Sequence, residues 1–473
     1  MTAPQPTSPG RRRAALALAA ALVLGGVPGG LDAADAAIWP VVDPTPPATT
    51  PPGTTPVPTD GSAELDDTVA LPLPPSEDEV RQAVNLDVTR IVDKGGLGPA
   101  ASVRIVDVES GRSIYSSRSG TPRIAASTTK LFTATAALAS LGLETRFPTV
   151  IERKGRARTV TLVSGGDPRM TNAKLRLLAK QTAAALKSKQ PARTKVKGKL
   201  RKVVYVRLDD SVFAGASKLG TWRKGGYGLG TIQPVRGTAR TTVRSSDSAA
   251  SAARYFAKRL DSSLGRGWVV EYRGAKAAPA KARVVARVDS DTVHTLVKRM
   301  LLVSDNQVAE VLSRHVARSE GYRPTFAGGV KGTRKVMRRL GVDLGTSVLA
   351  DGSGLSAANK ISPAAVVNLL SVAAQPDRSE LRALLYEDWS LPLAGRTGTL
   401  AYRFTGKSEC ARGAVVAKTG SLDWEIALSG YTVGEDGRLK AFSIVANRLW
   451  TSKARDKARA AADRIAATVN GCV

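Results

Sequence analysis

Hydrophobic positions recur at helical spacing in several stretches of the chain. A helix is predicted from Ser76-Glu77-Asp78-Glu79 onward, because an acidic first turn is followed by an apolar stripe at Val80, Val84, Val88 and Ile91. The same spacing returns after Ala125 and resumes at Val293. It also occupies the Ala-rich stretch Ser452–Val469. These segments are predicted to be amphipathic helices that pack one face against a core.

Other stretches carry short β-branched or apolar runs that are separated by Gly, Asp and Ser turn signals, which is typical of strands. The predicted strands are Ala101–Val108, Ser113–Tyr115, Thr159–Val163, Val203–Leu208, Trp268–Tyr272, Arg283–Val288, Ala414–Ala417, Ile426–Val433 and Leu439–Asn447. An N-terminal helix, a strand set, a helical middle, and C-terminal strands with a final helix predict an α+β fold, with helices flanking an antiparallel sheet.

The character of the chain changes between residues 149 and 291. Short strand-like runs alternate there with turns and one helical stretch near Lys174–Leu186, which predicts a large, mostly β inserted region. Residues 79–148 and 292–473 are then the two parts of the main domain. From Ile151 to Arg207 there are 17 Lys/Arg and two acidic residues. This basic face is read as a solvated surface or, alternatively, as a contact for an anionic wall polymer or membrane surface.

The N-terminus predicts export. Arg11-Arg12-Arg13 precedes an apolar run from Ala14 to Val27 and a small-x-small site at Ala34-Asp35-Ala36, so residues 1–36 are read as a signal peptide. The apolar run is shorter than the roughly 20 residues that a membrane span needs. An uncleaved signal that tethers the chain to the membrane is the alternative. Residues 37–78 are rich in Pro and Thr and are predicted to be an extended tether.

Composition narrows the function. A net charge of +30 permits a nucleic-acid partner, but the sequence carries no motif for one, and none is predicted. The two cysteines, Cys410 and Cys472, are read as a disulfide partnership in an exported protein. The histidines, His294 and His315, form no metal-binding pattern. Neither a metal nor another cofactor is predicted, and a Ser-His-Asp triad is disfavoured.

One short stretch combines a hydroxyl and an amine. In Ala125-Ala126-Ser127-Thr128-Thr129-Lys130 a loop is predicted to run into a helix, with Ser127 at the helix N-terminus and Lys130 one turn later on the same face. A lysine beside a serine suits a nucleophilic hydroxyl, and a helix N-terminus offers N–H groups to an oxyanion. The structural alternative is a serine that only caps the helix.

Two further motifs follow in order: Ser304-Asp305-Asn306 and Lys418-Thr419-Gly420. With Ser127-Thr128-Thr129-Lys130 they resemble the serine penicillin-recognising enzymes, which implies a β-lactamase/transpeptidase-like fold. Further matches are Val163–Pro168, Leu208–Phe213, Leu349–Ser356 and Arg396–Leu400. From about Leu86 to the C-terminus the sequence therefore resembles the D-alanyl-D-alanine carboxypeptidase/endopeptidase family, the class C low-molecular-mass penicillin-binding proteins, whose members insert extra domains between the first two motifs.

The resemblance implies a role for each motif residue. Ser127 is the nucleophile and Lys130 its base, Ser304 relays a proton to the leaving amine, and Asn306 holds the substrate amide and orients Lys130. Lys418 and Thr419 bind the terminal carboxylate of the substrate, and Gly420 leaves room for the substrate along the strand edge. The backbone N–H groups of Ser127 and Ser421 form the oxyanion hole.

Substrate selection departs from the family pattern at one position. Family members commonly have Arg after Asp-Gly-Ser-Gly-Leu-Ser, whereas this chain has Ala357. Asp209 or Asp210 is a candidate partner for an ammonium group of the stem peptide, although paired aspartates at a strand end are typical turn residues.

The functional prediction is an exported serine DD-carboxypeptidase, or an endopeptidase as well, that acts on peptidoglycan stem peptides ending in D-Ala-D-Ala and is acylated by β-lactams. Two alternatives stay open. The first is a β-lactamase on the same catalytic core, and the second is a non-enzymatic wall-binding scaffold that acts through the basic insert.

Overall fold

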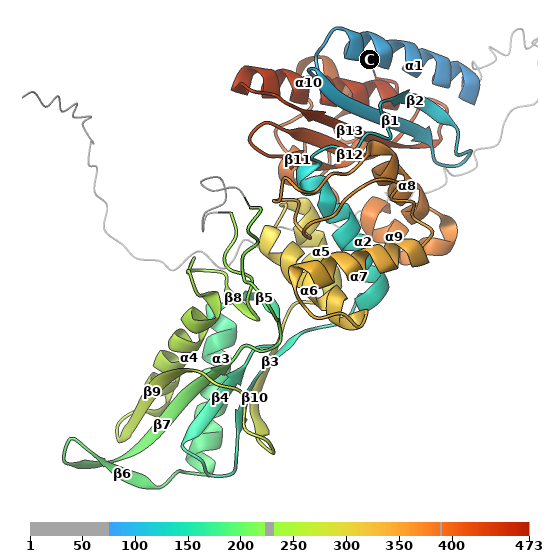
Figure 1. Cartoon of the computed structure of the whole chain (residues 1–473). Coiled ribbons are helices and arrows are strands. Elements are labelled where there is room, and N and C mark those ends of the chain that lie inside the picture. Colours follow the sequence, from blue (N-terminus) through green and yellow to red (C-terminus); the bar gives the residue numbers. More distant parts are fainter. Residues whose placement is uncertain (1–74, 223–230, 388–389, 473) are drawn as a thin grey trace, which may run out of the picture. The chain divides into compact units, whose positions relative to one another are not determined.

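The computed structural model describes residues 75–222, 231–387 and 390–472 (Figure 1). The predicted signal peptide, residues 1–36, and nearly all of the predicted tether, 37–78, lie outside these described residues. Among the described helices, none combines the length and the apolar character that crossing a membrane requires.

A five-stranded sheet organises the main part of the chain, with strand order β11-β12-β13-β1-β2 and antiparallel pairing throughout. Its strands are β1 (Ala100–Asp107), β2 (Ser113–Ser117), β11 (Val415–Ser421), β12 (Ile426–Val433) and β13 (Leu439–Asn447). The central strand β13 is buried along its whole length because both faces of the sheet are covered. The predicted α+β fold with an antiparallel sheet between helices is confirmed.

Two helices cover one face of this sheet (Figure 1). They are α1 (Glu77–Asp93) and α10 (Ser452–Asn470). Helix α1 begins where the sequence predicted: the Ser76 side chain accepts the N–H of Glu79, and the Glu79 carboxylate accepts the N–H of Ser76. Its buried residues, Val80, Val84 and Val88, pack with the inner side of α10 against the sheet.

A helical layer covers the other face and carries two of the three motifs. It contains α2 (Lys130–Leu141), α5 (Val293–Leu302), α6 (Asn306–Ser319), α7 (Phe326–Arg339), α8 (Pro363–Ala373) and α9 (Ser379–Arg382), with the short turns η1 (Ala126–Thr129), η2 (Pro376–Arg378) and η3 (Ala383–Glu387). Two further turns, η4 (Gly398–Leu400) and η5 (Gly406–Ala411), belong to the first face, where Leu400 and Ala411 join the core beneath α1 and α10. Thr292, Asp305, Thr325 and Ser362 cap α5, α6, α7 and α8 by accepting backbone N–H groups of the first turn. These caps fix where each helix begins, including α6 directly after Ser304-Asp305.

The segment between the first two motifs forms its own sheet, with order β10-β3-β4-β7-β6 and with β9 paired to β7. The strands are β3 (Pro148–Arg153), β4 (Thr159–Val163), β6 (Arg193–Val196), β7 (Lys199–Asp209), β9 (Trp268–Ala275) and β10 (Arg283–Asp289), and β5 (Asp167–Met170) pairs with β8 (Thr238–Arg240). Strand β4 runs parallel to β7, and β7 runs parallel to β9. The insert is therefore not a simple chain of hairpins.

Two helices pack on this second sheet and share its apolar core (Figure 1). Helix α3 (Asn172–Ser188) corresponds to the predicted helical stretch, whereas α4 (Ser248–Leu264) was not predicted. Its buried positions are mostly alanine, with Phe256 and Leu260, so the apolar stripe is weak in the sequence although it is buried in the fold. The predicted outer boundaries of the inserted domain, 149 and 291, stay a prediction.

Candidate active site

Ser127 lies on the turn η1 and not at the first position of helix α2, as the sequence had suggested. In a 3₁₀ turn, residues three apart eclipse each other. Lys130, the first residue of α2, therefore stands directly over Ser127, and its Nζ lies 2.9 Å from Ser127 Oγ. The neighbouring hydroxyls are used structurally, since Thr128 Oγ1 donates to Ala125 O and Thr129 Oγ1 to Ala126 O.

The turn is held in an unusual backbone conformation. Ala126 has φ +49°, in the left-handed region that alanine rarely adopts. Two glycines pack closely against this segment. A Cβ on Gly354 would lie 1.9 Å from Ala126 O, and a Cβ on Gly420 would lie 2.7 Å from Ala125 O. The loop at Gly354 and the strand β11 at Gly420 thus approach the Ser127 turn as closely as a backbone permits.

Lys130 is fully buried and donates hydrogen bonds to three oxygens. Besides Ser127 Oγ, these are Asn306 Oδ1 at 2.7 Å and the backbone oxygen of Ser353 at 2.6 Å. Burial lowers the pKa of Lys130 to about 8, and the nearby carboxylates of Asp351, Glu310 and Asp305 oppose this shift. The buried amine is therefore much closer to neutrality at physiological pH than a surface lysine.

The second motif stands at the junction of α5 and α6. Asp305 caps α6 by accepting the N–H of Val308, and Asn306 is the first helical residue. Asn306 Oδ1 accepts from Lys130, while its Nδ2 donates to Thr231 O at 3.4 Å. Ser304 has φ +58° and makes no hydrogen bond to any of the described residues. The structure thus joins Asn306, but not the Ser304 hydroxyl, to Lys130.

The third motif lies on β11, an edge strand of the main sheet. Ala417 N–H donates outward, to Pro392 O on the side away from β12. Because backbone groups alternate along a strand, the N–H groups of Thr419 and Ser421 face the same open edge. This is the direction that an oxyanion-hole donor at Ser421 needs.

Lys418 is fully buried, and its Nζ donates to Thr419 O at 2.9 Å. Burial, and then the charge of Lys130, lower the pKa of Lys418. Thr419 Oγ1 is paired with Thr399 Oγ1 at 2.7 Å. The positive charges of the two buried lysines repel each other. An anionic group bound beside them would stabilise their charged forms.

A loop from Asp351 to Ser356 closes the back of the site. The Asp351 carboxylate accepts the N–H groups of Gly354 and Ser356, both at 2.7 Å, and the indole N–H of Trp222 at 3.0 Å. Asn359 Nδ2 also donates to it at 2.8 Å. These bonds hold the Ser353 carbonyl in place to accept from Lys130.

Sequence reasoning missed one residue of this network, Glu310. It is fully buried on α6, one turn after Asn306, and accepts the N–H groups of Gly352 at 3.3 Å and Ser353 at 2.8 Å. Burial and repulsion from Asp351 raise the pKa of Glu310 to about 8. Its four-residue spacing from Asn306 was the available signal, since residues i and i+4 share a helix face.

Asp209 and Asp210 are both occupied within the insert. Asp209 accepts the N–H of Ser211 at 3.1 Å and of Ala278 at 2.9 Å, as a turn residue does. Asp210 pairs with Arg236 and accepts the N–H of Gly237 at 2.8 Å. A substrate-binding role for either aspartate stays a prediction.

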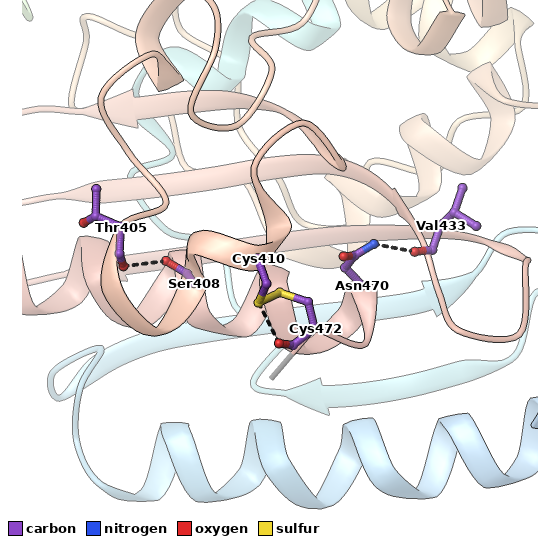
Figure 2. Close-up of a disulfide and its surroundings, with 6 residues drawn as sticks. All are labelled: Thr405, Ser408, Cys410, Val433, Asn470 and Cys472. Atoms are coloured by element: carbon purple, nitrogen blue, oxygen red, sulfur yellow. Dashed lines mark hydrogen bonds between the residues drawn. A yellow bond between two sulfur atoms is a disulfide. The ribbon is translucent and has the colours of Figure 1, made fainter.

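Cys410 in η5 and Cys472 after α10 are joined by a disulfide (Figure 2). It ties the C-terminal helix to the segment that leads into β11. The described residues contain no group of three or more His, Cys, Asp or Glu side chains that could hold a metal. His315 is buried, stacks on Phe147, and hydrogen-bonds to Gly166 O through Nε2 at 3.0 Å, so it packs the insert against α6.

Comparison with known proteins agrees with this architecture. Residues 84–239 and 229–469 match the D-Ala-D-Ala carboxypeptidase 3 (S13) family. Carboxypeptidase DacB of Mycolicibacterium smegmatis is 30% identical over 382 residues, which cover 78% of this chain and 80% of that protein. A D-alanyl-D-alanine carboxypeptidase of Actinomadura sp. is 28% identical over 447 residues, covering 76% of this chain and 80% of that protein.

The fold is also that of a solved relative. The structure of penicillin binding protein 4 from Haemophilus influenzae superposes with a TM-score of 0.66 at 22% identity, covering 80% of this chain and 98% of that one. Fold and family together define a serine-type DD-peptidase. The chain belongs to the D-Ala-D-Ala carboxypeptidase 3 (S13) family.

Proposed function

We propose that this chain removes the terminal D-alanine from peptidoglycan stem peptides, and opens D-alanine cross-links, through an acyl-enzyme on Ser127. The observation that carries the proposal is the buried amine of Lys130, 2.9 Å from Ser127 Oγ and held by Asn306 and Ser353. A serine hydroxyl is a weak nucleophile unless a neighbouring base accepts its proton. With a pKa of about 8, roughly one Lys130 in ten is neutral at pH 7 and can act as that base.

The proposed reaction proceeds in two halves. Ser127 Oγ attacks the carbonyl carbon of the penultimate D-alanine and its proton passes to Lys130 Nζ. The oxyanion is bound by the N–H groups of Ser127 and Ser421. The C–N bond then breaks, the leaving amine receives a proton through Ser304, and water later hydrolyses the ester with Lys130 again as base. Among the described residues the Ser304 hydroxyl has no hydrogen-bond partner. The proton relay through Ser304 therefore requires the bound substrate to hydrogen-bond to this hydroxyl.

Lys418 and Thr419 are proposed to bind the terminal carboxylate of the substrate. An anion there offsets the repulsion between the two buried lysines and supplies a charge-assisted hydrogen bond. Ala357 packs beside Ile124, Ala126 and Leu422, so a methyl group stands where the family commonly carries a guanidinium. We infer that a stem-peptide carboxylate is not bound by a cation at this position.

The decisive experiment is labelling with a fluorescent penicillin. Wild type, Ser127→Ala and the control Ser116→Ala, which alters an exposed hydroxyl on β2, are followed over an hour, together with D-alanine release from a pentapeptide ending in D-Ala-D-Ala. The proposal expects a stable label and D-alanine release from wild type and the control, and neither from Ser127→Ala. Rapid gain and loss of label indicates the β-lactamase alternative. No label on folded wild type, with wall binding retained, indicates the scaffold.

We also propose that the chain works outside the cytoplasm. The Arg-rich start with its apolar run, the wall substrate of the proposed reaction, and a disulfide between the only two cysteines support this. N-terminal sequencing of protein recovered from the producing cells tests whether cleavage follows Ala36. A mature chain that still begins before residue 14 supports the tethered alternative.

A second proposal concerns the hairpin of β6 and β7, which is proposed to contact an anionic surface of the cell envelope. Arg193, Lys195, Lys197 and Lys199 are exposed along it, and Leu200 beside them is also exposed. Their aligned charge favours polyanions at low salt. Triple replacement of the three lysines by glutamate is expected to abolish salt-sensitive binding to poly(glycerol phosphate) or to anionic vesicles. Comparing the two ligands separates polymer from membrane.

A further inference from the structure

Two exposed tryptophans stand side by side at one end of the active-site strand. Trp424 is 36% exposed and Trp450 is 63% exposed, and their ring centroids are 5.8 Å apart with the ring planes tilted by 55°. Within the described part of the chain the other two tryptophans, Trp222 and Trp268, lie largely inside: Trp222 bonds Asp351, and Trp268 belongs to the core of the insert. An exposed pair of the largest aromatic side chain usually serves recognition.

The two tryptophans lie on segments that adjoin the active-site strand: the turn between β11 and β12, and the segment after β13. Trp424 lies in the turn that connects β11 to β12, where Leu422 N–H donates to Glu425 O at 3.0 Å. Trp450 follows β13, and the N–H of its neighbour Leu449 donates to Trp424 O at 3.0 Å. Two residues before Leu449, at the end of β13, the Asn447 side chain accepts the N–H of Ile124 and donates to its carbonyl, both at 3.0 Å. Ile124 lies three residues before Ser127.

Leu422 connects the tryptophan pair to the active site. It forms a small apolar cluster with Ile124 and Ala126, and Ala357 packs against this cluster. Leu422 is two residues from Trp424 and touches the turn that carries Ser127. The tryptophan pair therefore lies beside the active site, at the end of it where β11 finishes.

The direction of the bound substrate identifies what reaches this end. In the reaction proposed above, the terminal carboxylate lies at Lys418 and Thr419, and the scissile carbonyl lies at the Ser421 N–H. The peptide on the acyl side must then continue past Ser421 toward Leu422 and Trp424. In peptidoglycan that peptide leads back to a sugar of the glycan strand after three to four residues, an extended reach of about 10–14 Å. The three residues from Ser421 to Trp424 span up to about 10 Å.

We propose that Trp424 and Trp450 form a binding platform for a sugar ring of the glycan strand that carries the stem peptide. This rests on the DD-peptidase function proposed above and names the part of the substrate beyond the peptide. A pyranose ring presents C–H groups with partial positive charge on one face, and the face of an indole ring carries partial negative charge. The two rings therefore stack, and stacking removes apolar surface of both from contact with water. The preferred substrate is then a disaccharide–peptide or an uncut glycan strand, rather than a free peptide.

The experiment compares two substrates with the same pentapeptide, one free and one attached to its N-acetylglucosaminyl–N-acetylmuramyl disaccharide. Wild type, Trp450→Ala, Trp424→Ala and the control Tyr402→Ala are assayed; Tyr402 is a 97% exposed aromatic between η4 and η5. The disaccharide is expected to lower KM about 3–10-fold in wild type and in the control. Trp450→Ala and Trp424→Ala are expected to lose this gain, with kcat and the free-peptide KM unchanged.

Equal KM values for both substrates in wild type, or equal losses on both substrates in the tryptophan variants, would overturn the proposal. The rate of penicillin acylation and the thermal unfolding midpoint report whether the variants keep the fold and the site. If wild type cleaves neither substrate, the DD-peptidase function fails, and the platform is tested alone by titrating the peptide-free disaccharide against tryptophan fluorescence. A saturable change that Trp450→Ala abolishes supports the platform, and the absence of any change in wild type refutes it.

Discussion

The Glu310 carboxylate accepts the N–H of Ser353 at 2.8 Å, and the carbonyl of the same Ser353 accepts from Lys130 at 2.6 Å. One peptide segment thus connects a buried acid on α6 to the proposed base on α2. Asn306, one turn before Glu310 on the same helix, contacts Lys130 directly. Helix α6 therefore positions the amine from two sides.

Substitutions of Glu310 separate the effect of its hydrogen bonds to the loop at Gly352 and Ser353 from the effect of its charge on Lys130. Glu310→Ala leaves the Gly352 and Ser353 N–H groups unpaired and frees the loop, so penicillin acylation is expected to fall at least tenfold. Glu310→Gln keeps an acceptor and is expected to retain most of the rate. Glu310 has a pKa raised to about 8, so it carries its negative charge mainly above that pH, where the charge raises the pKa of Lys130. Glu310→Gln removes this contribution, so the acylation rate should level off at a lower pH than in wild type. An acylation rate measured from pH 5 to 10 checks both points, and an unchanged profile in Glu310→Gln would contradict the electrostatic link.

The pH profile of the wild-type enzyme follows from Lys130. Burial lowers its pKa to about 8, and only the neutral amine accepts a proton. The acylation rate at low substrate is therefore expected to rise about tenfold per pH unit up to about pH 7 and to level off above pH 8. A neutral β-lactam ester serves as the control for carboxylate binding. A rate that is flat between pH 6 and 8 would exclude Lys130 as the base.

Carboxylate recognition by Thr419 can be isolated with paired substrates. Thr419→Val replaces the hydroxyl with a methyl group of similar size. It is expected to raise KM about tenfold for a peptide that ends in a carboxylate. For the corresponding peptide amide the effect should disappear. Thr399→Val, which removes the hydrogen-bond partner of Thr419, is the matched comparison and should have a smaller effect. Equal effects of Thr419→Val on acid and amide would indicate a packing role only.

The sequence predicted the main sheet and its outer helices well because their apolar patterns are strong and local. Val80, Val84 and Val88 keep helical spacing, and β13 is mostly apolar from Ala441 to Ala446, with Ser443 as the polar exception. Helix α4 was missed because alanines carry its buried face, and small side chains reveal burial only once the neighbouring strands are in place. The parallel pairing of β4 with β7 joins residues that are 46 apart in sequence, such as Thr159 and Tyr205, which no local pattern specifies.

For the site, the three motifs were visible as residue types but their geometry was not. Ser127 was expected to open a helix and instead lies on a 3₁₀ turn, since the close approach of Gly354 and Gly420 sets the conformation of Ala126. Glu310 had no motif of its own. Its importance arises from full burial and from contacts with residues 352 and 353, which only the tertiary fold supplies.

The disulfide is expected to support stability rather than chemistry. Cys410 and Cys472 are 62 residues apart in sequence, and closing a loop of that size typically contributes about 2–4 kcal/mol. The double variant Cys410→Ser/Cys472→Ser should unfold at lower denaturant while its penicillin acylation rate stays unchanged at 20 °C. Mass spectrometry of an unreduced digest tests the pairing itself. Free thiols at both positions in the native protein would contradict it.

Gly354 links the fold to the nucleophile most directly. Its φ is +81°, and an added Cβ would lie 1.9 Å from Ala126 O, so Gly354→Ala must displace the turn that carries Ser127. The expected cost is about 3 kcal/mol or more in the free energy of unfolding, with acylation reduced at least a hundredfold. Gly345→Ala is the matched control, because Gly345 also has positive φ, at +50°, but faces open space. The control should cost only about 1 kcal/mol and leave acylation intact. Unfolding curves and penicillin acylation rates on both variants separate backbone strain, which they share, from displacement of Ser127, which only Gly354→Ala produces.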